Sequence, residues 1–233
     1  MTHLIYSHHH ADHASASSLF DKGVVRIGHQ ETRRLLLRDN DPARPAPEVT
    51  FQDRYTLEVA GERVELAWHG PNHTPDNIFI HFPDHDAFML VDIVNPGWAP
   101  VYLSNLTEDI PGYLQVPGTA LSYPWKHFIG GHLGRLGTRD DVRLHQQYMT
   151  DITASVRTTL PTLDPTPYFQ KYGENVWAAF KSSLDEIART AAAPVIEKYT
   201  GVLGAADVFT ESTTFQVMQS IRLDLGDGFY VHP

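Results

Sequence analysis

The chain has 233 residues, of which 42% are hydrophobic and 20% charged, as is usual for a globular protein that buries one sizeable core. The absence of cysteine from the sequence excludes disulfides, iron–sulfur clusters and thiolate ligands, so a metal site must use histidine and carboxylate. The net charge of −10 disfavours a nucleic-acid partner, because phosphate contacts need clustered lysine and arginine.

The sequence shows neither an apolar stretch near the ~20 residues of a membrane span nor a visible signal peptide. We therefore expect a cytoplasmic protein that has no membrane partner and acts on a small-molecule substrate. A leader missing from the amino end would change the expected location. We also expect a single domain over residues 1–233, with a metal-binding sheet region at 1–135 and a mainly helical region at 136–233.

Strand signals dominate the first 132 residues. Short runs that are apolar, or that alternate between apolar and polar residues, predict strands. The expected strands are residues 2–6, 24–27, 55–59, 64–68, 77–82, 87–93 and 125–129. Turn residues within 55–68 and within 77–93 predict two hairpins. The expected short helices are residues 14–21 and 31–38, followed by a loop rich in proline and aspartate at 39–48.

The remaining elements are predicted to be helical. The expected helices are residues 107–123, 138–159, 174–200 and 213–223, with a break at 161–167. Pro111, Gly112 and Pro117 should divide the first of these into one or two short helices, and Pro194 should interrupt the third. Thr138, followed by acidic residues, predicts a capped helix start.

Four potential metal ligands fall within six positions near the amino end, in the motif His8-x-His10-x-Asp12-His13. The motif directly follows the apolar residues 4–6, and the alternation of a strand would place His8 and His10 on the same side. A tight turn would then bring Asp12 and His13 nearby. Two imidazoles for one cation, and a carboxylate with an imidazole for a second, suit zinc. The alternative interpretation is a loop of solvated histidines or a purification tag.

This motif resembles the signature of the metallo-β-lactamase superfamily, and three further segments resemble the superfamily's other marks in the same order. The segments are Gly70-Pro-Asn-His73-Thr-Pro, Leu90-Val-Asp92 and Ile129-Gly-Gly-His132. The resemblance spans residues 8–132 and implies an αββα metallo-β-lactamase-like sandwich of the α/β (α+β) class. It implies a first metal held by His8, His10 and His73. It further implies a second metal held by Asp12, His13 and His132, with Asp92 between the two.

The chain departs from the superfamily's pattern in three places. It begins seven residues before the first motif, where members usually have several strands, so we expect an amino-terminally shortened sandwich. A second copy could cover the sheet edge exposed in this way, which leads us to expect a homo-oligomer. Residues 14–17 replace the usual glycine pair, and Ile93 stands where one β-lactamase subclass has serine. The residue at Ile93 counts against a β-lactamase.

The resemblance implies a dinuclear zinc-dependent hydrolase that uses a metal-bound hydroxide on an ester, lactone, thioester or cyclic amide, with lactonase-like activity among these. Asp12 would orient the nucleophile and later carry a proton. The implied cofactor is two Zn²⁺ ions, and iron or manganese could take their place. Two alternatives stay open: an iron-dependent oxidoreductase of the same fold, and a truncated metal-binding protein without turnover.

The nine other histidines are expected to be surface or core residues. They are His3, His9, His29, His69, His81, His85, His127, His145 and His232. Of these, His9 should point away from its neighbours and His69 could line the site. A group of aromatic residues between Asp92 and His132 could equally wall an apolar pocket or belong to the core. The group comprises Trp98, Tyr102, Tyr113, Tyr123 and Trp125.

Overall fold

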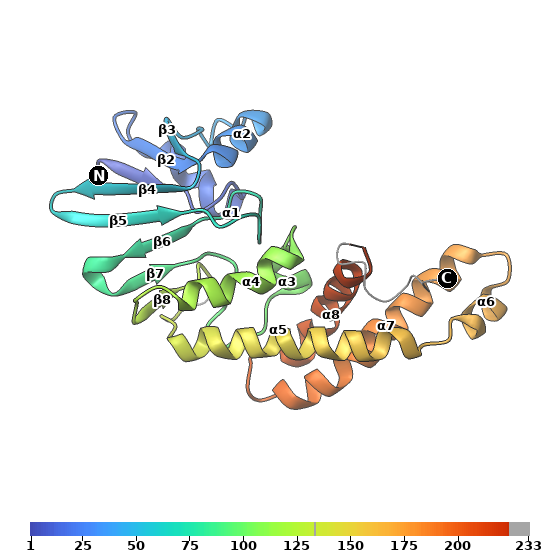
Figure 1. Ribbon diagram of the computed structural model, residues 1–233. Helices are drawn as coiled ribbons and strands as arrows, with labels where there is room; N and C mark the ends of the chain where they lie inside the picture. Colours follow the sequence, from blue (N-terminus) through green and yellow to red (C-terminus); the bar gives the residue numbers. More distant parts are fainter. Residues whose placement is uncertain (133, 224–233) are drawn as a thin grey trace.

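Two β-sheets face each other in the computed structural model, which describes residues 1–132 and 134–223 (Figure 1). The first sheet is parallel, with the strand order β1 (His3–Ile5), β2 (Val25–His29) and β3 (Val49–Phe51). The strands of the second sheet follow chain order: β4 (Arg54–Val59), β5 (Glu62–Ala67), β6 (Phe79–Phe82), β7 (Ala87–Met89) and β8 (His127–Ile129). Neighbours in the second sheet are antiparallel, except that β7 and β8 are parallel.

The alternation of side chains along β6 shows how the layers are built. Ile80 belongs to an apolar layer between the two sheets, together with Ile27 of β2 and Leu57 of β4. Its neighbour Phe79 points to the other side, where it packs against Phe88 in a larger core beneath the second sheet. Strand β6 is therefore buried on both faces.

Helices cover the outer face of each sheet (Figure 1). Leu36 of α2 (Gln30–Asp39) packs against Tyr6 beside the first sheet. On the opposite side, α4 (Ile110–Leu121) and α5 (Arg139–Thr159) contribute to the larger core beneath the second sheet. This arrangement confirms the αββα sandwich expected from the sequence.

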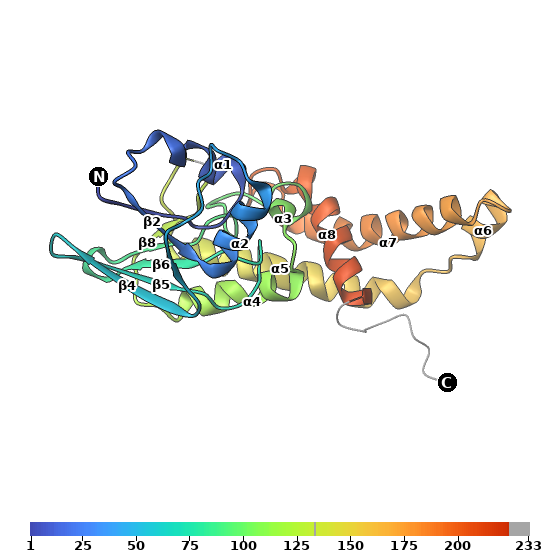
Figure 2. The ribbon, with the colours of Figure 1, turned by 90° about the horizontal axis from the view of Figure 1, so that it is seen from above.

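The last helices extend away from the sheets as an arm (Figure 2). Helix α7 (Val176–Tyr199) runs beside α5, α6 (Thr166–Tyr172) lies at the far end of the arm, and α8 (Ala206–Leu223) packs against α5 and α7. Their buried residues, such as Ile187 and Val217, continue the larger core. Within the described ranges, none of the helices is both long enough and apolar enough to cross a bilayer.

The expected helix interruptions at proline are wrong. Pro111 lies in the first turn of α4, where the amide hydrogens need no partner within the helix, so it does not oppose the helix. Pro117 and Pro194 lie inside continuous helices. Both helices bury apolar faces in the large core, and this packing outweighs one missing backbone hydrogen bond. Strand β3 was also not expected, because three residues are too few to show an alternating pattern.

The predicted start of α5 is confirmed. Thr138 Oγ1 accepts a hydrogen bond from the Asp141 amide at 3.3 Å, and the Asp141 carboxylate accepts one from the Thr138 amide at 2.8 Å. Arg135 donates two further hydrogen bonds to Asp141. This reciprocal capping satisfies donors that the first turn of a helix otherwise leaves unpaired.

Candidate metal centre

The candidate ligands from the second sheet lie at the carboxyl ends of three of its strands. Strand β6 is antiparallel to both β5 and β7, and β8 is parallel to β7, so β5, β7 and β8 run in the same direction. Their carboxyl ends therefore meet at one edge. The segments that follow these ends carry His73, Asp92 and His132. A rigid sheet thus fixes the positions of loop residues, as is usual for catalytic groups.

The remaining candidates follow β1. His8 and His10 lie in the segment after the strand, and their ring centroids are 4.7 Å apart. Asp12 and His13 lie in a single-turn helix, α1 (Ala11–Ala14), rather than in the tight turn that the sequence suggested. One helical turn brings these two side chains back toward the loop that precedes them.

The first of two ligand groups consists of His8, His10, His73 and Asp92, whose ligand atoms all lie within 4.8 Å of one another. His73 Nε2 is 3.1 Å from His10 Nδ1 and 3.3 Å from Asp92 Oδ2. His8 Nε2 is 3.5 Å from the same carboxylate oxygen. Three imidazole nitrogens and one carboxylate oxygen therefore surround a common space.

The second group consists of Asp12, His13, Asp92 and His132. His13 Nε2 is 3.0 Å from Asp92 Oδ2, 3.1 Å from His132 Nε2 and 3.3 Å from Asp12 Oδ2. His132 Nε2 is 3.0 Å from the other oxygen of Asp92. Asp92 thus belongs to both groups, and all seven residues singled out in the sequence are brought together.

The geometry of both groups fits a metal ion. Donors around a tetrahedral zinc ion with ordinary zinc–nitrogen bonds are separated by about 3.3 Å. The distances given above for pairs of donors run from 3.0 Å to 3.5 Å, and all donors of a group lie within 4.8 Å of one another. His8 Nε2 is buried and has no hydrogen-bond partner in the parts of the chain that the structure describes. Such atoms are costly to bury unless something binds them.

Burial sets the protonation of the histidines. It lowers the pKa of His8 well below its usual value, and the neighbouring histidines lower that pKa further. It also lowers the pKa of His73 to about 4. Burial opposes the charged form of His13 as well, but the hydrogen bond to Asp92 and the charges of Asp92 and Asp12 together outweigh it and raise the pKa of His13. His8 and His73 are therefore neutral near pH 7, the form in which imidazole binds metal.

Backbone conformation fixes the position of Asp92 and of the segment that precedes His132. Asp92 has a φ of 62°, in the left-handed region, and Asn105 Nδ2 donates a hydrogen bond to its carbonyl oxygen at 2.9 Å. A Cβ atom at Gly130 would lie 2.2 Å from the carbonyl oxygen of Val94. Only glycine fits at this position, which explains the glycine that precedes the last candidate ligand.

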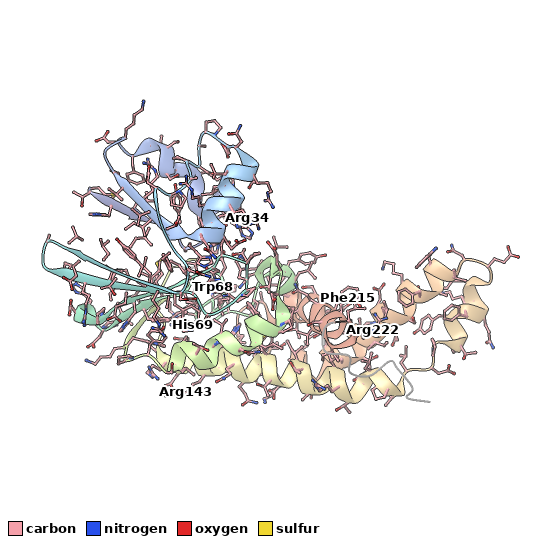
Figure 3. The ribbon with its side chains drawn as sticks, turned by 45° about the horizontal axis from the view of Figure 1, so that its top comes forward. Arg34, Trp68, His69, Arg143, Phe215 and Arg222 are labelled. Atoms are coloured by element: carbon pink, nitrogen blue, oxygen red, sulfur yellow. The ribbon has the colours of Figure 1, made fainter. Side chains whose placement is uncertain are left out.

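Two asparagines and a tryptophan shape the loop that carries His73. Asn72 Oδ1 accepts hydrogen bonds from the His73 amide at 2.7 Å and from Asn77 Nδ2 at 3.0 Å. Trp68 Nε1 donates to the carbonyl oxygen of Pro75 at 3.0 Å. Figure 3 shows Trp68 where β5 ends. Asn72 Nδ2 donates to the carbonyl oxygens of Gly70 and Asn77, so both ends of this side-chain amide hold the loop.

A cavity of about 570 Å³ opens onto both ligand groups. His10, Asp12, His73, Asp92 and His132 form one side of it. Its other wall comes from the segment around α3 (Tyr102–Leu106) and consists of Val101, Tyr102, Asn105 and Leu106. A cavity of this size accommodates a small-molecule substrate.

The histidines expected to lie outside the site do not belong to either ligand group. His9 Nδ1 is hydrogen-bonded to Asp76 Oδ1 at 2.8 Å, and His69 Nε2 to the Tyr123 hydroxyl at 2.7 Å. Figure 3 shows His69 beside the second sheet, and it does not line the metal cavity. His145 is buried in the helical core. His232 lies outside the described residues.

The aromatic residues between Asp92 and His132 have different environments. Tyr102 lines the metal cavity, whereas Trp98 is partly exposed and bridges to Gly204. The other three pack in or against the large core. The sequence left the pocket and the core as equal interpretations, and each applies to part of the group.

Sequence patterns did not reveal Asn105, Asp76 or Glu108. Asn105 supports Asp92 from a segment that carries no motif, and Asp76 is a buried partner of His9. Glu108 Oε1 lies 4.0 Å from His10 Nε2, and His9, His10 and Glu108 form a third set of ligand-type residues. We assign no ion to this set, because His9 is already paired with Asp76. Only the Thr-Pro-Asp run after His73 offered a signal for Asp76.

Comparisons with known proteins agree with this geometry. Residues 1–97 match the model of the metallo-beta-lactamase superfamily. The fold is similar to that of a metallo-beta-lactamase from Pontibacter korlensis, with a TM-score of 0.54 and 20% identity over 63% of this chain and 68% of that one. It is also similar to FIM-1 from Pseudomonas aeruginosa, solved in a mono-zinc form, with a TM-score of 0.53 and 18% identity over 63% of this chain and 65% of that one.

A third solved structure, the DIM-1 metallo-beta-lactamase, has a TM-score of 0.52 and 21% identity over 61% of this chain and 66% of that one. At these identities the structural likeness shows the fold alone. Residues 1–97 are thus similar to the metallo-beta-lactamase superfamily, and the described chain shares the metallo-β-lactamase fold.

Proposed function

We propose that the protein is a hydrolase that depends on two divalent metal ions, most suitably zinc, and acts on an ester, lactone, thioester or cyclic amide. The observation that carries the proposal is the convergence of two ligand groups on Asp92. The first ion would be held by His8, His10 and His73. The second would be held by Asp12, His13 and His132, with Asp92 between the ions.

The donor set favours zinc. Five imidazoles and two carboxylates form a mixed nitrogen and oxygen site, which suits zinc better than the all-oxygen sites preferred by calcium or magnesium. FIM-1, which shares the fold, is described as a mono-zinc form. A single zinc ion per chain is therefore the outcome that a metal measurement must distinguish from two.

Asp12 is the carboxylate best placed to act on a substrate. Bound zinc would supply an activated water molecule and polarise the scissile carbonyl group. The Asp12 side chain is exposed to the cavity, and its Oδ2 atom lies 3.4 Å from His132 Nε2. It can orient a water molecule and carry a proton to the leaving group. Asp92, by contrast, is buried between the two groups and has no such freedom.

The proposal is tested by metal removal and reconstitution. Protein treated with a chelator and reloaded with zinc should contain two zinc ions per chain by elemental analysis. It should hydrolyse at least one substrate from a panel of a lactone, a β-lactam and a thioester, and it should not hydrolyse a phosphodiester. The metal-free protein should show no turnover, since none of the described residues that line the cavity is serine, threonine, cysteine or lysine.

A matched pair of histidine variants tests the ligand assignment. His10→Ala should lose one zinc ion and about 100-fold or more in kcat/KM, because the first group loses one of its three imidazoles. His127→Ala removes an exposed histidine of β8 and should change neither quantity. If the two variants have the same zinc content and the same kcat/KM, His10 is not a metal ligand.

Two other experimental outcomes would favour a different function over hydrolysis. Iron in protein purified without added zinc, with oxygen consumption on a reducing substrate, would indicate an oxidoreductase. Two bound zinc ions without turnover on any substrate class would indicate a metal-binding protein that has no catalytic activity.

A further inference from the structure

The wall that faces the ligand groups is a left-handed turn. Four consecutive residues, Leu103, Ser104, Asn105 and Leu106, have φ values of 51°, 50°, 61° and 60°. None of them is glycine, and each such residue costs free energy in this conformation because Cβ crowds the following carbonyl oxygen. A turn of this kind persists only where the surroundings hold it, and it is typical of functional sites.

Asn105 is the residue that holds the turn to the metal centre. Its Oδ1 atom accepts hydrogen bonds from the Val101 amide at 2.7 Å and from Asn95 Nδ2 at 3.0 Å. Its Nδ2 atom donates to the Asp92 carbonyl oxygen at 2.9 Å. Ser212 of α8 accepts a further hydrogen bond from the Leu103 amide at 3.3 Å. The turn is therefore fixed between Asp92 and α8.

The turn presents an apolar wall to the cavity. Val101, Tyr102 and Leu106 line it and are exposed, and Leu106 is 62% exposed. Among the described residues that line the cavity, none is lysine or arginine, and the carboxylates belong to the ligand groups. A carboxylate on a substrate would find no side-chain cation here. The wall instead suits an uncharged substrate with an apolar group.

A second cavity of about 580 Å³ adjoins the first at Tyr102, which lines both. Its walls come from Leu103 and from α7 and α8, and its apolar lining includes Ala188, Val208 and Phe215. Figure 3 shows Phe215 on α8 where the helical arm meets the rest of the molecule. The charged residues of this cavity, Lys181, Asp185 and Glu211, carry both signs. The apolar part of this lining thus continues the apolar wall away from the ligand groups.

We propose that the substrate is an uncharged ester or lactone with an extended, unbranched acyl chain. Its carbonyl group lies at the ligand groups, and its chain passes over Tyr102 into the cavity between α3, α7 and α8. This inference rests on the proposed hydrolytic function. In the reaction, the oxygen of water bonds to the acyl carbon and the acyl carbon–oxygen bond breaks. One proton of water moves to the leaving oxygen, so the products are a carboxylic acid and a hydroxyl group.

Binding to the metal-free protein separates this inference from the hydrolase proposal. Methyl ketones with propyl, heptyl and undecyl chains are uncharged and resist hydrolysis, and calorimetric titration measures their affinity. Affinity should rise about tenfold or more from the propyl to the heptyl ketone, because added methylenes leave water for an apolar surface. The same affinity for all three ketones would overturn the inference.

Lysine substitutions show where the hydrocarbon chain of the ligand binds. Leu106→Lys places a charge on the wall and Val208→Lys places one in the second cavity. Val176→Lys is the control, since Val176 is 50% exposed and begins α7 beside α6 at the far end of the arm. Val208→Lys should weaken binding of the undecyl ketone about tenfold and leave that of the propyl ketone unchanged. Leu106→Lys should weaken binding of both the heptyl and undecyl ketones. The control should change neither.

Turnover of neutral esters completes the test. The zinc-loaded protein should hydrolyse nitrophenyl octanoate and dodecanoate with higher kcat/KM than the butyrate, and it should prefer them to a carboxylate-bearing β-lactam. If ketone affinity rises with chain length but no ester is hydrolysed, the apolar binding site stands and the hydrolase proposal is wrong. If the butyrate or the β-lactam is hydrolysed with the highest kcat/KM, the hydrolase proposal stands and the proposal of an extended acyl chain is wrong.

Discussion

The buried histidines of the candidate metal centre and the buried histidine of the helical core have different surroundings. His8 and His73 have lowered pKa values, and both point a ring nitrogen toward the carboxylate of Asp92. His145 of α5 also has a lowered pKa, about 3, and the cause is burial alone. Its ring packs edge-on against Tyr113, and its Nε2 atom finds no hydrogen-bond partner in the described ranges.

Burial alone therefore does not identify a metal ligand in this fold. The ligand groups are distinguished by convergence, because donors from separate segments of chain meet within hydrogen-bond distance of one carboxylate. The backbone adds a second distinction, since Asp92 and the turn that supports it adopt left-handed conformations. The helical core around His145 consists instead of regular helices packed through apolar residues. The predictions below test each side of this contrast.

The largest effect should come from Asp92→Asn. The substitution keeps the shape of the side chain but removes the negative charge shared by both groups, so we expect loss of at least one zinc ion. We also expect kcat/KM to fall by more than about 100-fold, because even residues that only support metal ligands cost about 10- to 100-fold. Two zinc ions and near-normal turnover in Asp92→Asn, together with an inactive His132→Ala, would place Asp92 outside the metal centre.

Substitution of Asn105 should have the next largest effect. Asn105→Asp keeps an acceptor for Val101 and replaces the donor to the Asp92 carbonyl with an oxygen, whereas Asn105→Gly keeps the left-handed preference and removes every side-chain bond. Both should weaken zinc affinity about tenfold in competition with a chelator. Unchanged affinity in both variants would show that the turn and the metal centre are independent.

His145→Leu should change the acid sensitivity of the fold. The pKa of His145 in the folded state, about 3, lies below the ordinary histidine pKa of 6.5. Between these pH values the unfolded state binds the extra proton, so stability falls as the pH drops below 6.5. Between neutral pH and about pH 5, the free energy of unfolding should therefore fall by about 2 kcal/mol less in His145→Leu than in the wild-type protein. Urea titrations of both metal-free proteins at the two pH values measure this difference. A loss that stays the same would mean that His145 takes up a proton inside the core.

The smallest effect belongs to an ordinary helix cap. Thr138→Ala removes the hydroxyl that accepts from Asp141 and should lower the free energy of unfolding by about 1 kcal/mol. Thr158→Ala, which removes an exposed hydroxyl bonded within the same helix, is the control and should cost less. Thermal unfolding separates the two, with a shift of about 2–4 °C expected for Thr138→Ala. Zinc affinity should not change in either variant.

Local chemistry explains what the sequence predicted well. The spacing of His8, His10, Asp12 and His13 is a property of a short segment, so a resemblance could identify it. Thr138 likewise forms its cap with residues only three positions away. The strands of the second sheet could be predicted because each alternates apolar and polar residues or forms a buried run.

Tertiary context determined the rest. Leu103 and Leu106 lie in a left-handed turn without glycine, and no local rule predicts that conformation for leucine. Asn105 acts through Asp92, which is thirteen positions away and belongs to another element. Pro194 lies in a continuous helix because packing of α7 in the core, which local propensity does not describe, stabilises it.

The parallel pairing of β7 and β8 has a consequence for how such a protein can diversify. Parallel neighbours cannot be joined by a tight turn, so the chain must leave the sheet after β7 and return to begin β8. This excursion contains α3 and α4, while Asp92 and His132 lie just beyond the paired strands. Outside Asn105, which supports Asp92, and the residues buried in the large core, the length and sequence of this excursion can therefore vary without displacing either residue. The exposed residues of the excursion can thus change the substrate range while the ligand residues stay the same.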